Sequence, residues 1–303
     1  MPRRFRNLYP HETHGPADLV RWKFANRTPE PPPFAPPIAR DATIAANQDF
    51  ATWIGHSSFL FRLGTKSILV DPVFSDYCAP FPIRRFKRHA PPGLDLAKIP
   101  KPEVVLITHN HYDHLDWPTI RILPNETLFI VPLGLAAWFR ARGKSNVREL
   151  PWWQSTDFDG LRITSVPAQH FSSRTPWDRD RTLWCGWILQ EAGKTLYITG
   201  DTGYCPVFRE IGAKFGPINL AAIPIGAYEP RWFMKPIHVM PEESVAIHQE
   251  VRSKLSVACH WGTFRLTDEP MDEPPKRLAQ ALQAAQISPA SFRVLNIGET
   301  ITF

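Results

Sequence analysis

The segment LITHNHYDHLD, residues 106–116, constrains the fold of this chain more than any other part of the sequence. An apolar run enters it, so a buried strand is expected to end there and to be followed by a loop. That loop carries three histidines and an aspartate close together: His109, His111, Asp113 and His114. Neutral imidazoles and carboxylates are the ligands that zinc and similar transition metals prefer. The loop holds more such residues than one structural site needs, which indicates two neighbouring metal ions.

Three later segments repeat the pattern of an apolar run that ends in a residue able to bind a metal. VPAQH ends at His170, YITGD at Asp201 and VACH at His260. Each run is expected to be a strand that delivers the polar residue at its carboxyl end. Five other histidines are interpreted as polar surface residues by default, with burial and a hydrogen bond as the alternative for His56 and His248: His11, His14, His56, His89 and His248.

From Ala51 onward the chain alternates short apolar runs with amphipathic segments. Strands are expected within residues 51–72, with a turn at 63–65, and at 103–109, 128–132, 161–168, 183–190, 195–201, 218–226, 255–261 and 291–298. Helices are expected at 134–143, 241–253 and 273–286. Two strand-rich halves, each followed by helices, predict two packed sheets with helices outside them.

The first 49 residues are expected to be a proline-rich arm that lies on the body, which begins at residue 50. The stretch at 28–40 can form neither a helix nor a central strand, because its prolines lack the N–H group that both require. Aromatic residues favour docking of this arm over a disordered leader: Phe5, Trp22, Phe24 and Phe34.

Charge and composition limit the partners and the compartment. The net charge of +6 and the pI of about 9.2 favour anionic partners. The four cysteines are far apart and form no CxxC pair, so reduced thiols packed as small hydrophobic groups are expected. No apolar stretch resembles a secretory signal or a membrane span. A cytoplasmic protein is expected, with contact to the inner face of a membrane left open.

The pattern H-x-H-x-D-H resembles the signature of the metallo-β-lactamase superfamily. Longer segments are similar to the family of N-acyl-phosphatidylethanolamine-hydrolysing phospholipase D and its bacterial relatives: WIGHSSFLF, SILVDPVFSDYCAPF, ITHNHYDHLD, VPAQHFSSRT, YITGDTGY, PIGAYEPRWFMK and ACHWGTFRLTDEP. The similarity runs from about residue 50 to the C-terminus. It implies an α/β fold, a four-layer αβ/βα sandwich, with residues 50–303 forming the hydrolase domain.

The resemblance also implies a role for each motif residue. The first metal would be held by His109, His111 and His170, the second by Asp113, His114 and His260, and Asp201 would bridge them. The metals are expected to be two Zn²⁺ per chain, with Fe or Mn as alternatives. Asp113 and His238 are the expected catalytic residues, and Tyr112 and His238 the expected substrate-binding residues. For His238, the alternative is a surface histidine beside a helix.

The implied function is a dinuclear zinc phosphodiesterase of the phospholipase D type. It would release phosphatidic acid and an N-acylethanolamine from N-acyl-phosphatidylethanolamine-like lipids, through a hydroxide that bridges the metals. One alternative is a soluble hydrolase of small phosphorylated or lactone substrates; a nuclease and a metal-holding binding module are weaker alternatives. The expected partners are a phospholipid or other phosphodiester, a membrane surface and a second copy of the chain, and no nucleic acid.

The segment CAPFPIRRFKRHAPPG, residues 78–93, combines aromatic and basic side chains. One interpretation places its rings in an anionic lipid surface, with Arg84, Arg85, Lys87 and Arg88 beside the head groups. The other is a solvated basic loop whose aromatic residues pack inward.

Overall fold

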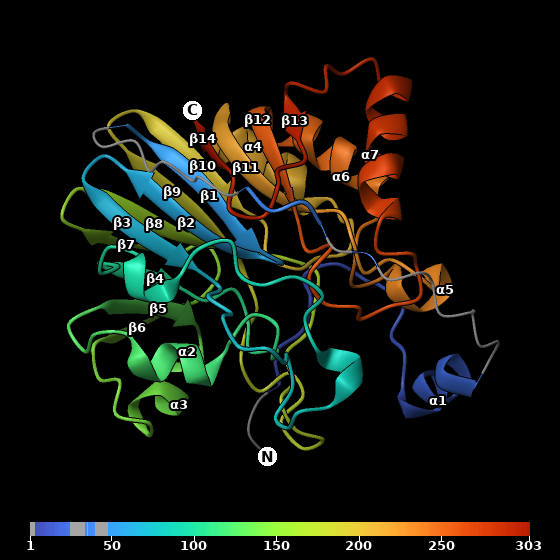
Figure 1. The fold of residues 1–303 in the computed structure, drawn as a ribbon, viewed down its shortest axis with the longest axis horizontal. Helices are drawn as coiled ribbons and strands as arrows, with labels where there is room; N and C mark the ends of the chain where they lie inside the picture. Colours follow the sequence, from blue (N-terminus) through green and yellow to red (C-terminus); the bar gives the residue numbers. More distant parts are fainter. Residues whose placement is uncertain (1–3, 25–33, 35, 40–47) are drawn as a thin grey trace.

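The computed structural model describes residues 4–24, 34, 36–39 and 48–303, and the account below concerns those residues (Figure 1). Two seven-stranded sheets form its centre. In spatial order, the first sheet contains β14 (Thr300–Thr302), β1 (Phe50–Gly55), β2 (Ser58–Leu63), β3 (Lys66–Val70), β4 (Val104–Leu106), β5 (Leu128–Pro132) and β6 (Val147–Leu150). The second contains β13 (Phe292–Arg293), β12 (Ser253–Cys259), β11 (Ile218–Pro224), β10 (Lys194–Ile198), β9 (Gly186–Glu191), β8 (Leu161–Val166) and β7 (Ser155–Phe158).

Helices cover the outer faces of both sheets (Figure 1). The helices of the described residues are α1 (Pro16–Phe24), α2 (Trp117–Ile122), α3 (Ala136–Arg140), α4 (Val207–Phe215), α5 (Arg231–Met234), α6 (Pro241–Glu250) and α7 (Glu273–Ala284), with short 3₁₀ turns at Arg84–Phe86 and Leu96–Lys98. Helices α2 and α3 lie on the first sheet, and α4, α6 and α7 lie on the second. The predicted four-layer sandwich is confirmed.

The layering follows from strands that are apolar on both faces. In β4, Val104 and Leu106 point into the core between the sheets, whereas Val105 points to the core beneath α2 and α3. A strand buried on both faces reads as a continuous apolar run, which is why residues 104–107 carry no alternation. Gly64 has φ +58° in the turn between β2 and β3, at the predicted position and in the conformation that glycine tolerates best.

The strand directions bring distant residues to one edge of the sandwich. Strands β10, β11 and β12 are parallel, so their carboxyl ends meet at the same edge of the second sheet. Strand β8 runs in the same direction, because β9 is antiparallel to both β8 and β10. In the first sheet β3, β4 and β5 are also parallel. The motif residues follow the carboxyl ends of β4, β8, β10 and β12.

The N-terminal arm is not irregular throughout, since Pro16–Phe24 forms α1. Trp22 is buried and its indole N–H donates to Asp268, which anchors the helix on the body. Phe24 does not dock, because 84% of its side chain is exposed. Most of the predicted extended stretch at 28–40 lies outside the described residues, and the domain boundary at residue 49 stays a prediction.

Two further features bear on the predictions from composition. All four cysteines are free and buried, as expected for thiols packed as small hydrophobic groups. Across the part of the chain that the structure describes, every helix is too short or too polar to cross a bilayer.

Candidate metal centre

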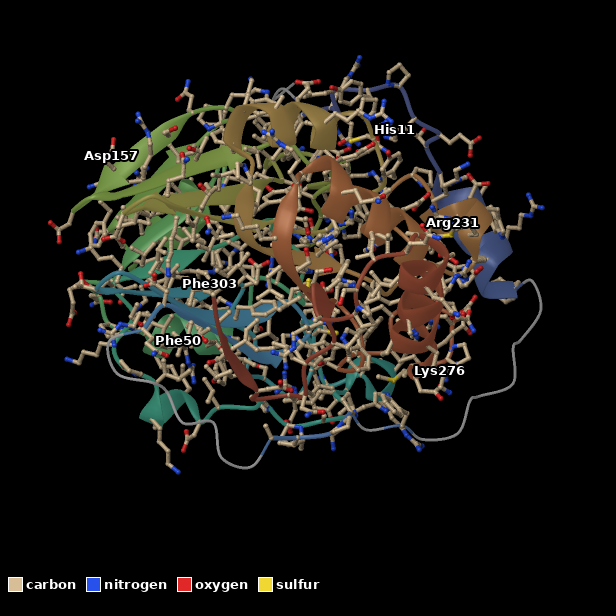
Figure 2. All side chains as sticks on the ribbon, turned by 90° about the horizontal axis from the view of Figure 1, so that it is seen from above. His11, Phe50, Asp157, Arg231, Lys276 and Phe303 are labelled. Carbon is tan, nitrogen blue, oxygen red and sulfur yellow. The ribbon has the colours of Figure 1, made fainter. Side chains whose placement is uncertain are left out.

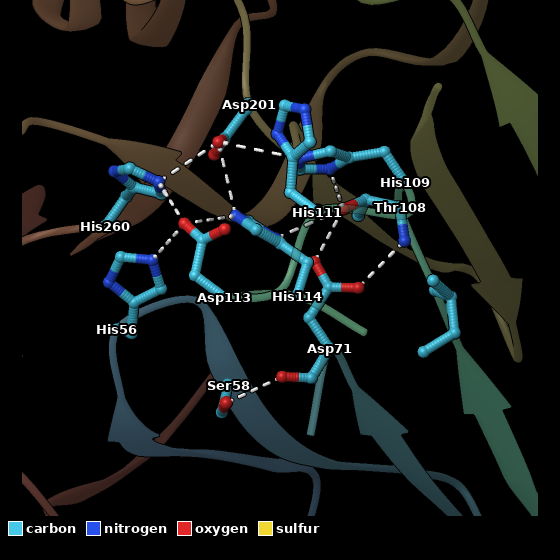
Figure 3. Close-up of polar contacts among 12 residues, drawn as sticks. His56, Ser58, Asp71, Thr108, His109, His111, Asp113, His114, Asp201 and His260 are labelled. Atoms are coloured by element: carbon cyan, nitrogen blue, oxygen red, sulfur yellow. Dashed lines mark hydrogen bonds and ion pairs between the residues drawn. The ribbon is translucent and has the colours of Figure 1, made fainter. Parts of the chain in front are cut away.

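Seven motif residues from four strand ends converge on one small region. Figure 3 labels all of them except His170. They fall into two groups that share a carboxylate. We call His109, His111 and His170 the first ligand group, and Asp113, His114 and His260 the second. Asp201 lies between the two groups. The structure therefore brings together every residue that the sequence placed at a metal.

In the first ligand group, ring nitrogens face one another at short range. His111 Nδ1 lies 2.9 Å from His109 Nε2 and 3.3 Å from His170 Nε2. Two ligand nitrogens on one tetrahedral zinc, each about 2.05 Å from the ion, would lie roughly 3.3 Å apart. The spacing of these nitrogens thus suits a single small cation.

The second ligand group is richer in carboxylate contacts. Asp113 Oδ2 lies 3.5 Å from His114 Nε2 and 3.4 Å from His260 Nε2. The same oxygen accepts a hydrogen bond of 2.9 Å from Nε2 of His56. Figure 3 shows Asp113 between these three rings, with its carboxylate turned toward them.

A single oxygen of Asp201 reaches both groups. Oδ2 of Asp201 lies 3.2 Å from His114 Nε2 and 3.0 Å from His260 Nε2. It also lies 3.8 Å from the Nε2 atoms of His109 and His170. This is the position expected of a carboxylate that bridges two metal ions.

Hydrogen bonds on the outer side of the rings fix which nitrogen points inward. Nδ1 of His114 donates to Asp71 at 2.7 Å, and Nδ1 of His170 donates to the Ile237 carbonyl at 2.9 Å. Nδ1 of His109 donates to Thr108 Oγ1 at 3.0 Å, because that hydroxyl gives its own proton to Asp71. Such partners commonly orient metal-binding histidines. In a neutral ring, each leaves the Nε2 lone pair directed inward.

The donor set fits a metal. Within the described residues, the buried atoms His114 Nε2 and His260 Nε2 lack a well-aligned hydrogen bond although they face Asp201 Oδ2, and Asp201 Oδ1 has no partner. Buried polar atoms rarely remain unsatisfied, so each calls for an explanation such as an ion. Imidazole nitrogens with carboxylate oxygens are the ligands that zinc takes in catalytic sites.

The two groups differ in protonation in the metal-free chain. Burial lowers the pKa of His111 to about 3 and that of His170 to about 4. Burial would also lower the pKa of His260, but the charges of Asp201 and Asp113 outweigh it and raise this pKa to about 9. The pKa of Asp201 is well below its usual value despite burial, because His114 and His260 lie beside it.

His238 lies beside the metal residues, as the sequence suggested. Its ring centroid is 5.0 Å from that of His170 and 5.2 Å from that of His260. Its Nδ1 has no hydrogen-bond partner among the described residues. The backbone carbonyl of His238 accepts a hydrogen bond of 2.7 Å from Arg231, which holds the loop before α6. Burial lowers the pKa of His238 well below 6.5, so its imidazole is neutral.

Tyr112 does not contact the ligand atoms. Its hydroxyl donates to the Arg174 carbonyl at 3.2 Å, and the Arg174 guanidinium lies 3.9 Å from the centre of its ring. The ring lines a neighbouring cavity of about 650 Å³ together with Trp117 and Trp138. A role for Tyr112 in substrate binding stays a proposal.

For His56 the default interpretation, a surface position, is wrong, and the alternative of burial with a hydrogen bond is confirmed. The side chain is buried against Asp113 and His260, a place beside the candidate metal ligands that sequence reasoning did not predict. Its φ of +53° is uncommon for a residue other than glycine, and His260 has φ +57°. Such conformations cluster at functional sites. The only sequence signal was a polar residue directly after the apolar run of β1.

Comparisons with known proteins agree with this geometry. The β-lactamase superfamily domain matches residues 66–261. N-acyl-phosphatidylethanolamine-hydrolyzing phospholipase D 1 of Caenorhabditis elegans is 39% identical over 82% of this chain and 74% of that protein. The mitochondrial N-acyl-phosphatidylethanolamine-hydrolyzing phospholipase D of Saccharomyces cerevisiae is 34% identical over 76% of this chain and 51% of that protein.

A solved structure has the same fold. Igni18, a metallo hydrolase of the archaeon Ignicoccus hospitalis, superimposes with a TM-score of 0.64 at 23% identity, over 84% of this chain and 98% of that one. The domain match over most of the chain and the identity to the worm protein show that this chain belongs to the metallo-β-lactamase superfamily of metal-dependent hydrolases.

Proposed function

We propose that this protein is a phosphodiesterase of the phospholipase D type that hydrolyses N-acyl-phosphatidylethanolamine-like phospholipids to phosphatidic acid and an N-acylethanolamine. The observation that carries the proposal is a converged set of seven candidate metal ligands in a chain 39% identical to a protein named for this reaction. The finer assignments of zinc, of two ions per chain and of the lipid substrate belong to the proposal.

Each residue of the site would have a role that follows from its position. The first ligand group and the second ligand group would each hold one divalent cation, with Asp201 shared between them and Asp113 serving as both a ligand and a catalytic residue. Bound there, two zinc ions would supply Lewis acidity at a phosphoryl group and would acidify water. Outside the ligand atoms, the hydrogen bonds from His114 and His170 to Asp71 and Ile237 hold the rings in place.

His238 is proposed to contact the phosphate. A neutral imidazole has one N–H to donate and one lone pair, and Nδ1 of His238 has no partner among the described residues. The low pKa supports a role as a neutral hydrogen-bond donor to a phosphoryl or leaving-group oxygen. Arg231 orients the backbone at this position from α5.

The cavity beside Tyr112 supports an amphiphilic substrate. It combines the rings of Tyr112, Trp117 and Trp138 with two guanidinium groups, Arg142 and Arg174, and two carboxylates, Asp76 and Asp116. Both arginines stack on Trp138, at 4.1 Å and 5.4 Å from its ring centre. Aromatic walls with a few cations suit a ligand with an apolar body and an anionic group.

The test is hydrolysis by the zinc-loaded protein of three substrates in parallel: an N-acyl-phosphatidylethanolamine, a short water-soluble phosphodiester and a lactone. We expect release of N-acylethanolamine, detected by mass spectrometry, and a higher kcat/KM for the lipid than for the other two. Faster turnover of the lactone or of the small phosphorylated compound would overturn the lipid assignment in favour of the soluble-metabolite alternative.

A matched pair of histidine variants tests the role of His238. His238→Ala should lower kcat at least about tenfold with unchanged metal content, because it removes a group that meets the phosphate. The control is His248→Ala, since His248 is buried on α6 and bonds only to Ser256 at 2.8 Å in the described structure. Equal kcat in both variants would make His238 an ordinary structural histidine.

Contact with a membrane is a separate part of the proposal, and the structure corrects one residue of it. Arg88 is buried, donates to the Val73 carbonyl at 3.0 Å and lies over the Phe264 ring, so it cannot reach a lipid. Phe81 and Ile83 are 70% and 46% exposed. The neighbouring cations Arg84, Arg85 and Lys87 are exposed as well.

Replacing those three cations by glutamine should weaken binding to anionic vesicles, because each exposed cation contributes on the order of 1 kcal/mol near such a surface. Co-sedimentation with vesicles containing phosphatidylserine measures this. Turnover of the soluble phosphodiester is the control and should not change. Unaltered vesicle binding would leave the loop as a solvated surface. The predicted homodimer and the predicted absence of nucleic acid stay predictions.

A further inference from the structure

The N-terminal strap, residues 4–14, lies against the wall of the metal centre. It borders a cavity of about 650 Å³ whose other lining includes His170, Phe171 and Ile237. Backbone N–H of Phe5 donates to the Asp180 carbonyl at 2.8 Å, and the Tyr9 hydroxyl donates to Glu210, so the strap is held on both sides of residue 7. Figure 2 shows His11 on this segment, at the edge of the body.

The Asn7 side chain joins the strap to the first ligand group. Its Nδ2 donates to the backbone carbonyl of His170 at 2.9 Å, and its Oδ1 accepts from the backbone N–H of His170 at 3.1 Å. The amide therefore pairs with both backbone groups of a candidate metal ligand, much as a neighbouring strand would. His170 needs such support because it follows the end of β8, where the sheet ladder has stopped.

Two more contacts fix the orientation of the Asn7 amide. Oδ1 also accepts from the Trp184 indole N–H at 2.9 Å, and Nδ2 contacts His11 Nε2 at 3.1 Å. His11 Nδ1 lies 3.1 Å from the Tyr9 carbonyl and must donate to it, so in a neutral ring Nε2 is the acceptor. An asparagine amide has two donors and an oxygen with two lone pairs, and all four are used. Only one orientation of the amide satisfies them.

The His170 ring is thus held from two independent directions. Asn7 fixes the backbone, and the Ile237 carbonyl fixes Nδ1 of the ring. Together they set the direction of Nε2, which lies 3.3 Å from His111 Nδ1. Outer partners that orient a metal-binding histidine commonly change metal affinity 10–100-fold when removed.

We infer that Asn7 is a positioning residue for the first ligand group, so that the N-terminal strap completes a metal site formed otherwise by residues beyond 108. This inference rests on the proposed metal centre. Asparagine is required for it, because aspartate would place a carboxylate oxygen against the His170 carbonyl, and alanine would leave both backbone groups without the amide.

The test titrates Zn²⁺ alone against the full-length, metal-free protein in competition with a chromophoric chelator. Asn7→Ala and Asn7→Asp should raise the Kd of the first ligand group by about 10–100-fold and leave that of the second unchanged. His170→Ala identifies which step of the titration belongs to the first group. The matched control is Asn219→Ala, because Asn219 Oδ1 accepts from Thr195 N–H at 2.9 Å near the start of β11, away from the carboxyl-end edge.

The outcomes distinguish the role of Asn7 from the proposed metal centre on which it rests. If wild-type protein binds two Zn²⁺ and His170→Ala loses the first step, the proposed centre stands. Asn7→Ala must then lower the Zn²⁺ affinity of the first step more than Asn219→Ala does. The comparison holds when the two variants lose a similar amount of thermal stability without metal. Equal Zn²⁺ affinities in these two variants would overturn the role of Asn7. Unchanged Zn²⁺ binding by His170→Ala would instead overturn the metal centre itself.

Discussion

The two ligand groups lie side by side yet have opposite electrostatics. The first consists of imidazoles whose pKa values burial lowers, to about 3 at His111 and about 4 at His170. The second surrounds a carboxylate, and the charges of Asp201 and Asp113 raise the pKa of His260 to about 9. The first group is therefore neutral and ready for a cation at neutral pH, whereas the second must release a proton before a metal can bind.

Removing the shared carboxylate should abolish the difference between the groups. Asp201→Ala takes away the oxygen that reaches both, so Zn²⁺ content should fall at both and turnover should drop by more than about a thousandfold, which corresponds to roughly 4 kcal/mol of transition-state stabilisation. Elemental analysis and a phosphodiesterase assay measure this. Asp157→Ala, an exposed position labelled in Figure 2, is the control. Loss of one metal only would show that Asp201 serves a single group.

Changing pH should separate the groups. Between pH 6 and pH 8 the Zn²⁺ affinity of the second group should rise at least about a hundredfold, because His260, whose pKa is about 9, must lose a proton when an ion binds, and, despite burial, the neighbouring carboxylates also raise the pKa of His114. The first group should change little, since its histidines are already neutral. His170→Ala and His260→Ala, which disable one group each, allow separate titrations. Equal slopes against pH would contradict the predicted contrast.

The same pKa shifts predict that the metal-free chain loses stability at both high and low pH, each time through a different histidine. The folded-state pKa of His260 is raised, so its contribution is complete below about pH 6.5 and is lost as pH rises through about 9. The folded-state pKa of His170 is lowered, so its contribution is complete above about pH 6.5 and is lost as pH falls through about 4. Thermal melts without metal should show a weaker alkaline loss of stability in His260→Ala and a weaker acid loss in His170→Ala, while His114 and His111 keep part of each limit.

A smaller effect is expected at His56, which supports the second group only. His56→Ala removes the 2.9 Å hydrogen bond to Asp113, so the Zn²⁺ affinity of the second group should fall about tenfold. The first group should keep its affinity. His248→Ala, which removes another buried histidine, is the control for general loss of stability. A fall in the affinity of the first group would show that His56 supports the whole region.

The sequence predicted well those features that depend on local patterns, such as strands and the residues that follow them. Ligand residues follow apolar runs, and the run at 128–132 corresponds to β5 at both ends. Burial of His56 was one of the two interpretations, but its contact with Asp113 was not predicted, because the two residues lie 57 positions apart and a single histidine has no spacing to interpret. Arg88 was misplaced because a basic stretch does not reveal which of its side chains turns inward.

Helix α1 was missed for a similar reason. The segment is short, and isolated helices of this length are marginal without packing. Its anchor is the hydrogen bond from Trp22 to Asp268, which lies 246 residues away in the sequence. Asn7 is a comparable case, since its partner His170 is 163 residues away and the single asparagine belongs to no motif. Contacts at such separations depend on the whole fold.

An ion bound at the shared edge would connect the two sheets, and it would therefore affect how long the chain stays folded. An ion at the first ligand group would tie the loop after β4, in the first sheet, to the end of β8, in the second, across 59 residues between His111 and His170. Ligands that bind only the folded state stabilise it, and the stabilisation grows with the logarithm of the ligand concentration once that concentration exceeds Kd. Proteases cut chains that open, so the supply of the bound metal would govern how long each molecule survives as well as how fast it works.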